Sequence, residues 1–208
     1  MALVTISAAY GALGSEVGRR LADRLDVPFL DRAITAGVAQ RLALPLAEAE
    51  SLDESPATRV ERLLASFTQM GSLFGVTPAP IEEPTDEATF RRATEDIIRQ
   101  QAASGSAVIV GRAAMIVLAE HPHVVRVRLT GPRDARIQQA VRLHGLTRDE
   151  AERQARASDG VREAWVQRFY GRDVKDPSLY DLVINATRFD AEACVELIAQ
   201  TVAAEAAR

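Results

Sequence analysis

Apolar residues follow two different patterns along this chain. Short, mostly apolar segments are typical of strands buried on both faces, and longer segments with apolar positions three or four residues apart are typical of amphipathic helices. The first pattern predicts strands at residues 3–7, 27–30, 107–110, 124–129 and 182–184. The second predicts helices at 15–25, 32–42, 86–103, 132–144, 147–171 and 190–207, with two more within 45–70 and one ending near residue 120.

Helical segments follow every predicted strand. This order favours a parallel sheet, because right-handed crossover connections place helices on both faces. We therefore expect an α/β protein with a doubly wound, five-stranded parallel sheet. In such sheets ligands bind beyond the carboxyl ends of the strands, so the residues that follow each strand are the candidates for chemistry.

Local signals mark helix ends and the domain organisation. Thr147 and Glu150 form a capping-box pattern at a helix start, Gly160 is expected to interrupt that helix, and Asp190 is expected to cap the last helix. Glycine and proline are dense in residues 71–85, which predicts a long loop. We expect a single domain over residues 1–208, with a helical and loop insertion at 44–90.

The composition narrows the classes of function. The 208 residues carry a formal net charge of −4 with mixed signs, which argues against a nucleic acid polymer as partner. The single cysteine, Cys194, excludes a disulfide framework and a zinc cluster. We find no leader pattern and no apolar segment of membrane-spanning length, so we expect a cytoplasmic protein with no membrane partner. Among the 25 basic residues, Lys175 is the only lysine, so a site that needs a lysine has one candidate.

A glycine-bearing turn joins the first predicted strand to the first predicted helix. Backbone N–H groups in such a turn, together with the helix N-terminus, can hold phosphate. Against the phosphate-loop pattern G-x-x-x-x-G-K-[ST], Ser15 occupies the hydroxyl position, while Gly14 stands in place of the lysine and Ala8 in place of the first glycine. From this segment alone, an ordinary strand-to-helix turn is an equal alternative.

Charged residues also follow the other strands. Arg112, behind Gly111, can grip phosphate with two parallel hydrogen bonds, or it is a surface arginine at a helix start. Asp31 can hold Mg²⁺ through water or a ligand hydroxyl, or it caps a helix. Arg153 and Arg156 share one helix face, and ion pairs on a solvated face explain this spacing at least as well as ligand binding does.

The order and spacing of these motifs resemble the cytidylate-kinase-like family, a branch of the P-loop nucleoside monophosphate kinases. The resemblance covers nearly the whole chain except residues 44–90. The segments that carry it are 11–18 (GALGSEVG), 27–31 (VPFLD), 108–112 (VIVGR), 127–136 (VRLTGPRDAR), Asp159 with Arg162, and 180–185 (YDLVIN).

The resemblance implies a P-loop-type sheet and transfer of the ATP γ-phosphoryl group to a nucleoside monophosphate, CMP or dCMP in the first place, with ATP and Mg²⁺ as cofactors. A segment of the loop after the first strand would wrap the ATP phosphates, and its last residue would also lie near Mg²⁺. The residues of that segment are Gly11, Ala12, Leu13, Gly14 and Ser15.

The resemblance also implies the residues on the acceptor side and in the lid. Arg112 and Asp31 would bind the monophosphate substrate. A lid over residues 147–180 would close on the phosphates and exclude water. Its catalytic residues would be Arg153, Arg156, Asp159 and Arg162.

The chain departs from the family pattern at several positions. Gly14 replaces the phosphate-loop lysine, as is frequent in this branch, and Ala8 and Ala9 stand where an arginine and a glutamate are usual. Ala113 stands where an acidic residue usually follows the arginine. These departures leave open an alternative, a catalytically weak or inactive nucleotide-binding module that regulates a partner. They also make Lys175 a candidate substitute for the missing lysine.

A third hypothesis is an interaction protein. The predicted helices within residues 45–100 carry apolar residues at helical spacing, which suits either the core or a homodimer interface. The small-molecule partners expected under the first two hypotheses are nucleotides.

Overall fold

A computed structural model of the protein describes residues 2–31 and 87–207. The predicted helix at 32–42, the predicted loop at 71–85 and most of the predicted insertion at 44–90 lie outside these described residues. The predicted helix at 86–103 is confirmed as α5 (Glu87–Ala103).

Five parallel strands form one sheet in the order β2-β3-β1-β4-β5. They are β1 (Leu3–Ala8), β2 (Phe29–Leu30), β3 (Ala107–Val110), β4 (Val124–Thr130) and β5 (Leu182–Asn185). The doubly wound parallel sheet predicted from the sequence is confirmed, although β2 is shorter than the predicted segment 27–30. Because β1 pairs with β3 on one side and β4 on the other, the loop after β1 opens at the middle of the carboxyl edge.

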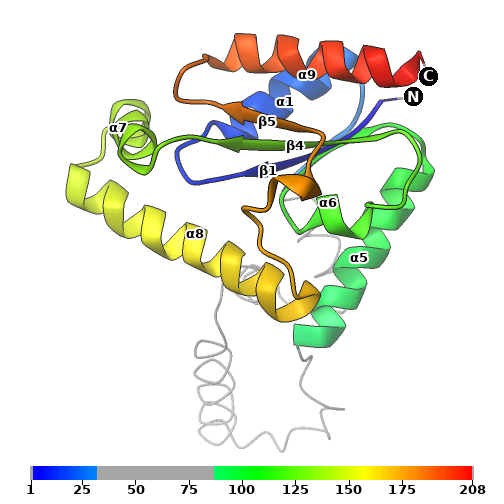
Figure 1. Ribbon diagram of the computed structural model, residues 1–208, viewed down its shortest axis with the longest axis horizontal. Coiled ribbons are helices and arrows are strands. Elements are labelled where there is room, and N and C mark those ends of the chain that lie inside the picture. Colours follow the sequence, from blue (N-terminus) through cyan, green and yellow to red (C-terminus); the bar gives the residue numbers. More distant parts are fainter. Residues whose placement is uncertain (1, 32–86, 208) are drawn as a thin grey trace, which may run out of the picture.

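Helices cover both faces of this sheet (Figure 1). α1 (Gly14–Leu25) and α9 (Ala191–Ala206) lie on one face, and α5 and α6 (Ala114–Val117) lie on the other. α7 (Arg133–His144) and α8 (Arg148–Tyr170) follow β4, and α8 runs on the side of α5 and α6 until it meets α5. A short 3-10 helix, Pro177–Leu179, precedes β5.

The alternation of side chains along β1 divides the core in two. One apolar cluster joins β1 to α1 and α9 and contains Val4, Ile6, Val17, Leu21 and Ile198. The other joins β1 to β3 and α5 and contains Leu3, Ile109, Phe90 and Ile98. Burial on both faces explains why these strands read as nearly continuous apolar runs in the sequence.

α8 is a single helix, so the predicted interruption at Gly160 is wrong. Ala151, Ala155 and Val166 are buried on the helix face that packs inward, and this burial holds the helix together on both sides of the glycine. The predicted capping box at Thr147 and Glu150 is confirmed at its start.

Two other predictions about helices can be compared directly. Asp190 caps α9, as predicted, by accepting a hydrogen bond from the backbone N–H of Ala193 at 2.8 Å. The helix expected to end near residue 120 is only the short α6, which stops at Val117. No helix in residues 2–31 or 87–207 is both long enough and apolar enough to cross a membrane.

Candidate functional site

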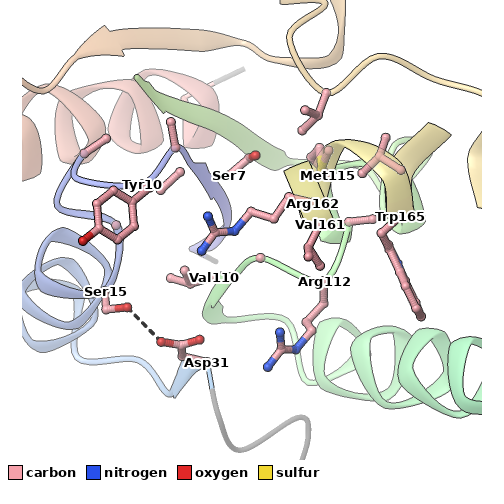
Figure 2. A pocket seen from close by; sticks show the side chains of 18 of the residues that line it. Ser7, Tyr10, Ser15, Asp31, Val110, Arg112, Met115, Val161, Arg162 and Trp165 are labelled. Carbon is pink, nitrogen blue, oxygen red and sulfur yellow. Dashed lines mark hydrogen bonds between the residues drawn. The ribbon is translucent and has the colours of Figure 1, made fainter. Parts of the chain in front are cut away.

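A cavity of about 360 Å³ opens at the carboxyl ends of β1 and β3 (Figure 2). Its walls come from the loop after β1, the turn after β3, one side of α5 and the middle of α8. This is the position where ligands bind in doubly wound sheets. The lining residues include 7–16, Asp31, Phe90, Arg91, Thr94, 110–113, Met115, Val161, Arg162, Trp165 and Tyr170.

The loop after β1 delivers the N-terminus of α1 to this cavity. Leu13 precedes the helix in a left-handed conformation with φ of 62°, at a position where the phosphate-loop pattern has glycine. No side chain caps the first turn of α1, so its N–H groups and the positive end of the helix dipole face the cavity. This arrangement suits an anion such as a phosphate group.

Side chains from α7 and α8 hold the same loop in place. Asp159 accepts a hydrogen bond from the Tyr10 backbone N–H at 2.8 Å and one from Arg136 Nη1 at 2.9 Å. Arg136 Nη1 also donates to the Tyr10 carbonyl at 2.7 Å. Gln139 Nε2 donates to the Gly11 carbonyl at 2.9 Å. The loop is therefore tied at consecutive backbone groups, and α8 is tied to it through Asp159.

Glycine is required at two positions of the loop for different reasons. Gly11 has φ of +73°, and a Cβ atom there would overlap with the backbone carbonyl of Arg136. Gly14 has ordinary helical geometry, but a Cβ atom there would overlap with the Cβ atom of Ala8. Ala8 thus leaves no room for a lysine at position 14, and the two departures from the phosphate-loop pattern depend on each other.

Ser15 and Asp31 meet at the edge of the cavity. Ser15 Oγ donates a hydrogen bond to Asp31 Oδ2 at 2.9 Å (Figure 2), and Arg112 lines the same cavity. A hydroxyl and a carboxylate are hard oxygen ligands of the kind that Mg²⁺ prefers. The described residues hold no cluster of three or more His, Cys, Asp or Glu side chains arranged as metal ligands. A magnesium ion here would thus rely on this pair and on oxygens of its ligand, which is usual for Mg²⁺.

Arg112 lies in a strained turn that directly follows β3. Gly111, Arg112 and Ala113 have φ values of 80°, 57° and 54°, so three consecutive residues are left-handed. Each non-glycine residue in this region costs about 1–2 kcal/mol, and such strain is usually retained where it positions a functional group. Here it directs the Arg112 side chain into the cavity (Figure 2).

Arg162 enters the cavity from α8. Its side chain is 49% exposed and lies 3.5 Å from Asp159, measured from Nη1 to Oδ1. Desolvation lowers the pKa of the guanidinium, and the nearby charges of Arg128 and Arg112 lower it further, while Asp159 and Asp31 act in the opposite direction. Burial is the largest cause of the lowered pKa and the charges of Arg128 and Arg112 are smaller ones, so an anionic ligand beside Arg162 would stabilise the charged guanidinium.

The end of the cavity away from the loop is aromatic. Trp165 of α8 lines it and packs edge to face on the buried Phe90, with ring centroids 6.3 Å apart. Tyr170 donates a hydrogen bond to Glu95 at 3.1 Å, and burial together with the negative charge of Glu95 raises its pKa. Thr94 adds a small polar group to the same wall. This end can accept a flat, partly apolar group.

The residues predicted from the sequence do not all meet here. The phosphate-loop residues 11–15, Asp31, Arg112 and Arg162 line the cavity. Asp159 acts on the loop rather than facing the cavity. Arg153 and Arg156 lie on the exposed face of α8, and Arg156 pairs with Glu152 at 3.8 Å. Neither arginine lines the cavity in this structure.

Lys175 is not among the residues that line the cavity, although its neighbour Val174 is. Its Nζ atom pairs with Glu163 at 2.7 Å, and 61% of its side chain is exposed. Its role as a substitute for the loop lysine remains a prediction.

Sequence reasoning missed Ser7, Phe90 and Thr94 as lining residues. Ser7 and Phe90 sit inside segments that read as core elements, so nothing in the sequence separated them from packing residues. A signal did exist for Arg128, which packs against Ser7: a central strand covered on both faces rarely contains arginine.

Comparisons with known proteins show the family of the chain. The sequence model of the cytidylate kinase-like family matches residues 3–188. A cytidylate kinase from Ignicoccus hospitalis is 26% identical over 199 residues, which are 95% of this chain and 97% of the relative.

Solved structures share the fold. An uncharacterized protein from Eubacterium ventriosum has a TM-score of 0.69 at 16% identity, with 98% of this chain and 99% of that chain covered. Shikimate kinase from Bacteroides thetaiotaomicron has a TM-score of 0.51 at 18% identity, with 97% and 98% covered.

The parallel sheet and the turn after β1 define an α/β protein with the fold of small P-loop kinases. Within this class, the chain belongs to the cytidylate kinase-like family.

Proposed function

We propose that the protein is a phosphotransferase that moves the γ-phosphoryl group of ATP to a nucleoside monophosphate, with CMP or dCMP as the preferred acceptor. The observation that carries this proposal is the convergence of an uncapped helix N-terminus, Arg112 and Arg162 on one cavity. Phosphoryl transfer depends on positioning and charge neutralisation more than on covalent chemistry by the protein, and these groups supply both.

Two further observations support a nucleotide acceptor. The aromatic end of the cavity, with Trp165 and Phe90, offers a surface for a flat ring. The Ignicoccus relative is named a cytidylate kinase, which favours a cytosine base. In this proposal residues 11–15 hold the ATP phosphates, and Arg112 with Asp31 binds the acceptor phosphate.

ATP and Mg²⁺ are the proposed cofactors. Ser15 and Asp31 would hold the magnesium ion, which would neutralise phosphate charge when it is bound. Residues 147–180 would form the lid, with Asp159 and Arg162 nearest the reaction and Arg153 and Arg156 reaching it only after closure. The single domain over 1–208, a cytoplasmic location and a homodimer remain predictions.

A second candidate function is favoured by a specific observation. Ala8 leaves no room for a lysine at position 14, so the loop lacks a cation that phosphate loops normally carry. A protein that binds nucleotide with little or no turnover, and regulates a partner, fits this loop as well.

Release of ADP from Mg-ATP, measured with CMP, dCMP, UMP, AMP, GMP and shikimate in turn, tests the proposal. We expect CMP or dCMP to stimulate release most strongly. Binding of ATP by calorimetry without stimulation by any acceptor would favour the second candidate function.

Arg112→Gln tests the acceptor site. Loss of one charge-assisted contact is worth about 1.5–3 kcal/mol, so KM for the monophosphate should rise about tenfold or more, with a smaller change in KM for ATP. Arg24→Gln is the matched control, because Arg24 lies in the last turn of α1 and pairs with Glu196 of α9. An unchanged KM for the monophosphate in Arg112→Gln would place the acceptor elsewhere.

A further inference from the structure

Two arginines lie on the same face of β4, and their surroundings differ. Arg126 and Arg128 are two residues apart, so their side chains leave the sheet on the same side. Both are unusual in a central strand whose two faces are covered by helices. Their partners show that only one of them is neutralised by the protein.

Arg126 forms a complete ion pair with Asp181, which precedes β5. Its Nη2 atom lies 2.6 Å from Asp181 Oδ1 and its Nε atom 3.1 Å from Asp181 Oδ2. The backbone N–H of Arg126 donates to the same carboxylate at 2.8 Å. Desolvation of Asp181 acts against ionisation, but these hydrogen bonds prevail and lower its pKa. This pair fastens β4 to the start of β5.

Arg128 has no such partner among the described residues. It is 8% exposed, and its Nη1 atom donates to Ser7 Oγ at 2.6 Å. Its guanidinium lies 5.9 Å from the ring centroid of Tyr180, a neutral side chain whose pKa is raised by burial. In residues 2–31 and 87–207 no carboxylate oxygen lies within 4.0 Å of it. A buried charge without a counter-charge is costly, so its retention calls for a compensating role.

The charge of Arg128 reaches the cavity. Ser7, which accepts its hydrogen bond, lines the cavity, and the two residues are paired in register across β1 and β4. Arg128 also lowers the pKa of Arg162, which projects into the cavity. The loop after β1 has no lysine, so Arg128 is a fixed cation beside a phosphate site whose usual cation is missing.

We propose that Arg128 is a positioning residue for the phosphate chain of the bound nucleotide. Its buried positive charge draws the chain toward the floor of the cavity, and its hydrogen bond fixes Ser7 Oγ at that floor. The missing counter-charge is supplied by the ligand itself. This inference rests on the proposed function only in requiring a polyphosphate ligand, and it does not require turnover.

Arg126 provides the matched control for variants of Arg128, because it lies on the same face of β4 but is paired with Asp181. Arg128→Met removes the charge and keeps most of the side-chain volume, Arg128→Lys keeps the charge, and Arg126→Met removes the neutralised arginine. The probes are inorganic tripolyphosphate and ATP, with affinity measured by calorimetry and thermal stability measured in parallel on the full chain.

We expect Arg128→Met to raise the Kd for tripolyphosphate about tenfold or more, while its melting temperature is unchanged or higher, because an uncompensated buried charge has been removed. Arg128→Lys should restore most of the affinity. Arg126→Met should lower the melting temperature, because Asp181 loses its partner, and leave the Kd within about twofold of the wild type.

Three results would overturn the inference: equal affinity in Arg128→Met and the wild type, an equal loss of affinity in Arg126→Met, or no binding of either probe by the wild type. Absence of turnover with every acceptor, together with the expected binding pattern, would refute the proposed function and leave this inference standing. If the wild type transfers phosphate to an acceptor and Arg128→Met binds tripolyphosphate as tightly as the wild type, this inference is refuted and the proposed function stands.

Discussion

At the scale of single residues, Ala8 and Gly14 are two departures from the phosphate-loop pattern that are coupled sterically. The methyl group of Ala8 occupies the space that a side chain at position 14 would need. Position 14 cannot hold a lysine while Ala8 is present, because even a Cβ atom there would overlap with the Ala8 side chain. The sequence showed both departures from the phosphate-loop pattern, but it could not show that they are in contact.

Introducing the missing lysine tests this steric coupling. Gly14→Lys alone should destabilise the protein by about 1–3 kcal/mol, because its Cβ atom overlaps with Ala8. The double variant Ala8→Gly with Gly14→Lys should recover most of that loss. Urea unfolding monitored by circular dichroism measures both. A single variant as stable as the wild type would contradict the coupling.

Other residue roles also depend on distances that the sequence does not contain. Arg112 could be proposed from its place after a strand, and it does line the cavity. The family resemblance implies a catalytic role for Asp159, and the structure adds a second contact: its carboxylate accepts a hydrogen bond from the backbone N–H of Tyr10, 149 residues away in the sequence. A contact of that range follows from how α8 packs, and no local pattern reveals it.

At the scale of elements, α8 is both a wall of the cavity and a tether for its loop. Residues 161–166 contribute Val161, Arg162, Trp165 and Val166 to the lining, and Asp159 holds the loop after β1. Hydrophobic periodicity predicted the helix, and the pattern of Thr147 and Glu150 predicted its capping box. The sequence prediction failed at Gly160, because a glycine in a helix costs only about 1 kcal/mol and burial of the flanking turns exceeds this cost.

Gly160→Ala tests whether this helix is continuous in solution. Gly160 is exposed, has no positive φ, and a Cβ atom there would meet nothing within 4 Å. Alanine should therefore raise the free energy of unfolding by about 0.5–1 kcal/mol. Thermal and urea unfolding measure the change. A destabilised variant would indicate that the chain departs from helical geometry at this residue.

At the scale of the whole molecule, the architecture was more predictable than the site. Alternating apolar segments were enough to predict a parallel, doubly wound sheet, because few topologies satisfy the rules for crossovers. The cavity draws on β1, β3, α5 and α8, and its aromatic end depends on how α8 meets α5. Such packing of distant elements is decided by side-chain fit, which the pattern of apolar positions does not encode.

The central claim is that this cavity transfers a phosphoryl group between two nucleotides. The most direct measurement follows label from ATP carrying ³²P at the γ position, in the presence of Mg²⁺ and CMP, with shikimate in place of CMP as a control. The account predicts that label moves to CDP and that shikimate stays unlabelled. Label that remains in ATP, or appears only as inorganic phosphate, would contradict it.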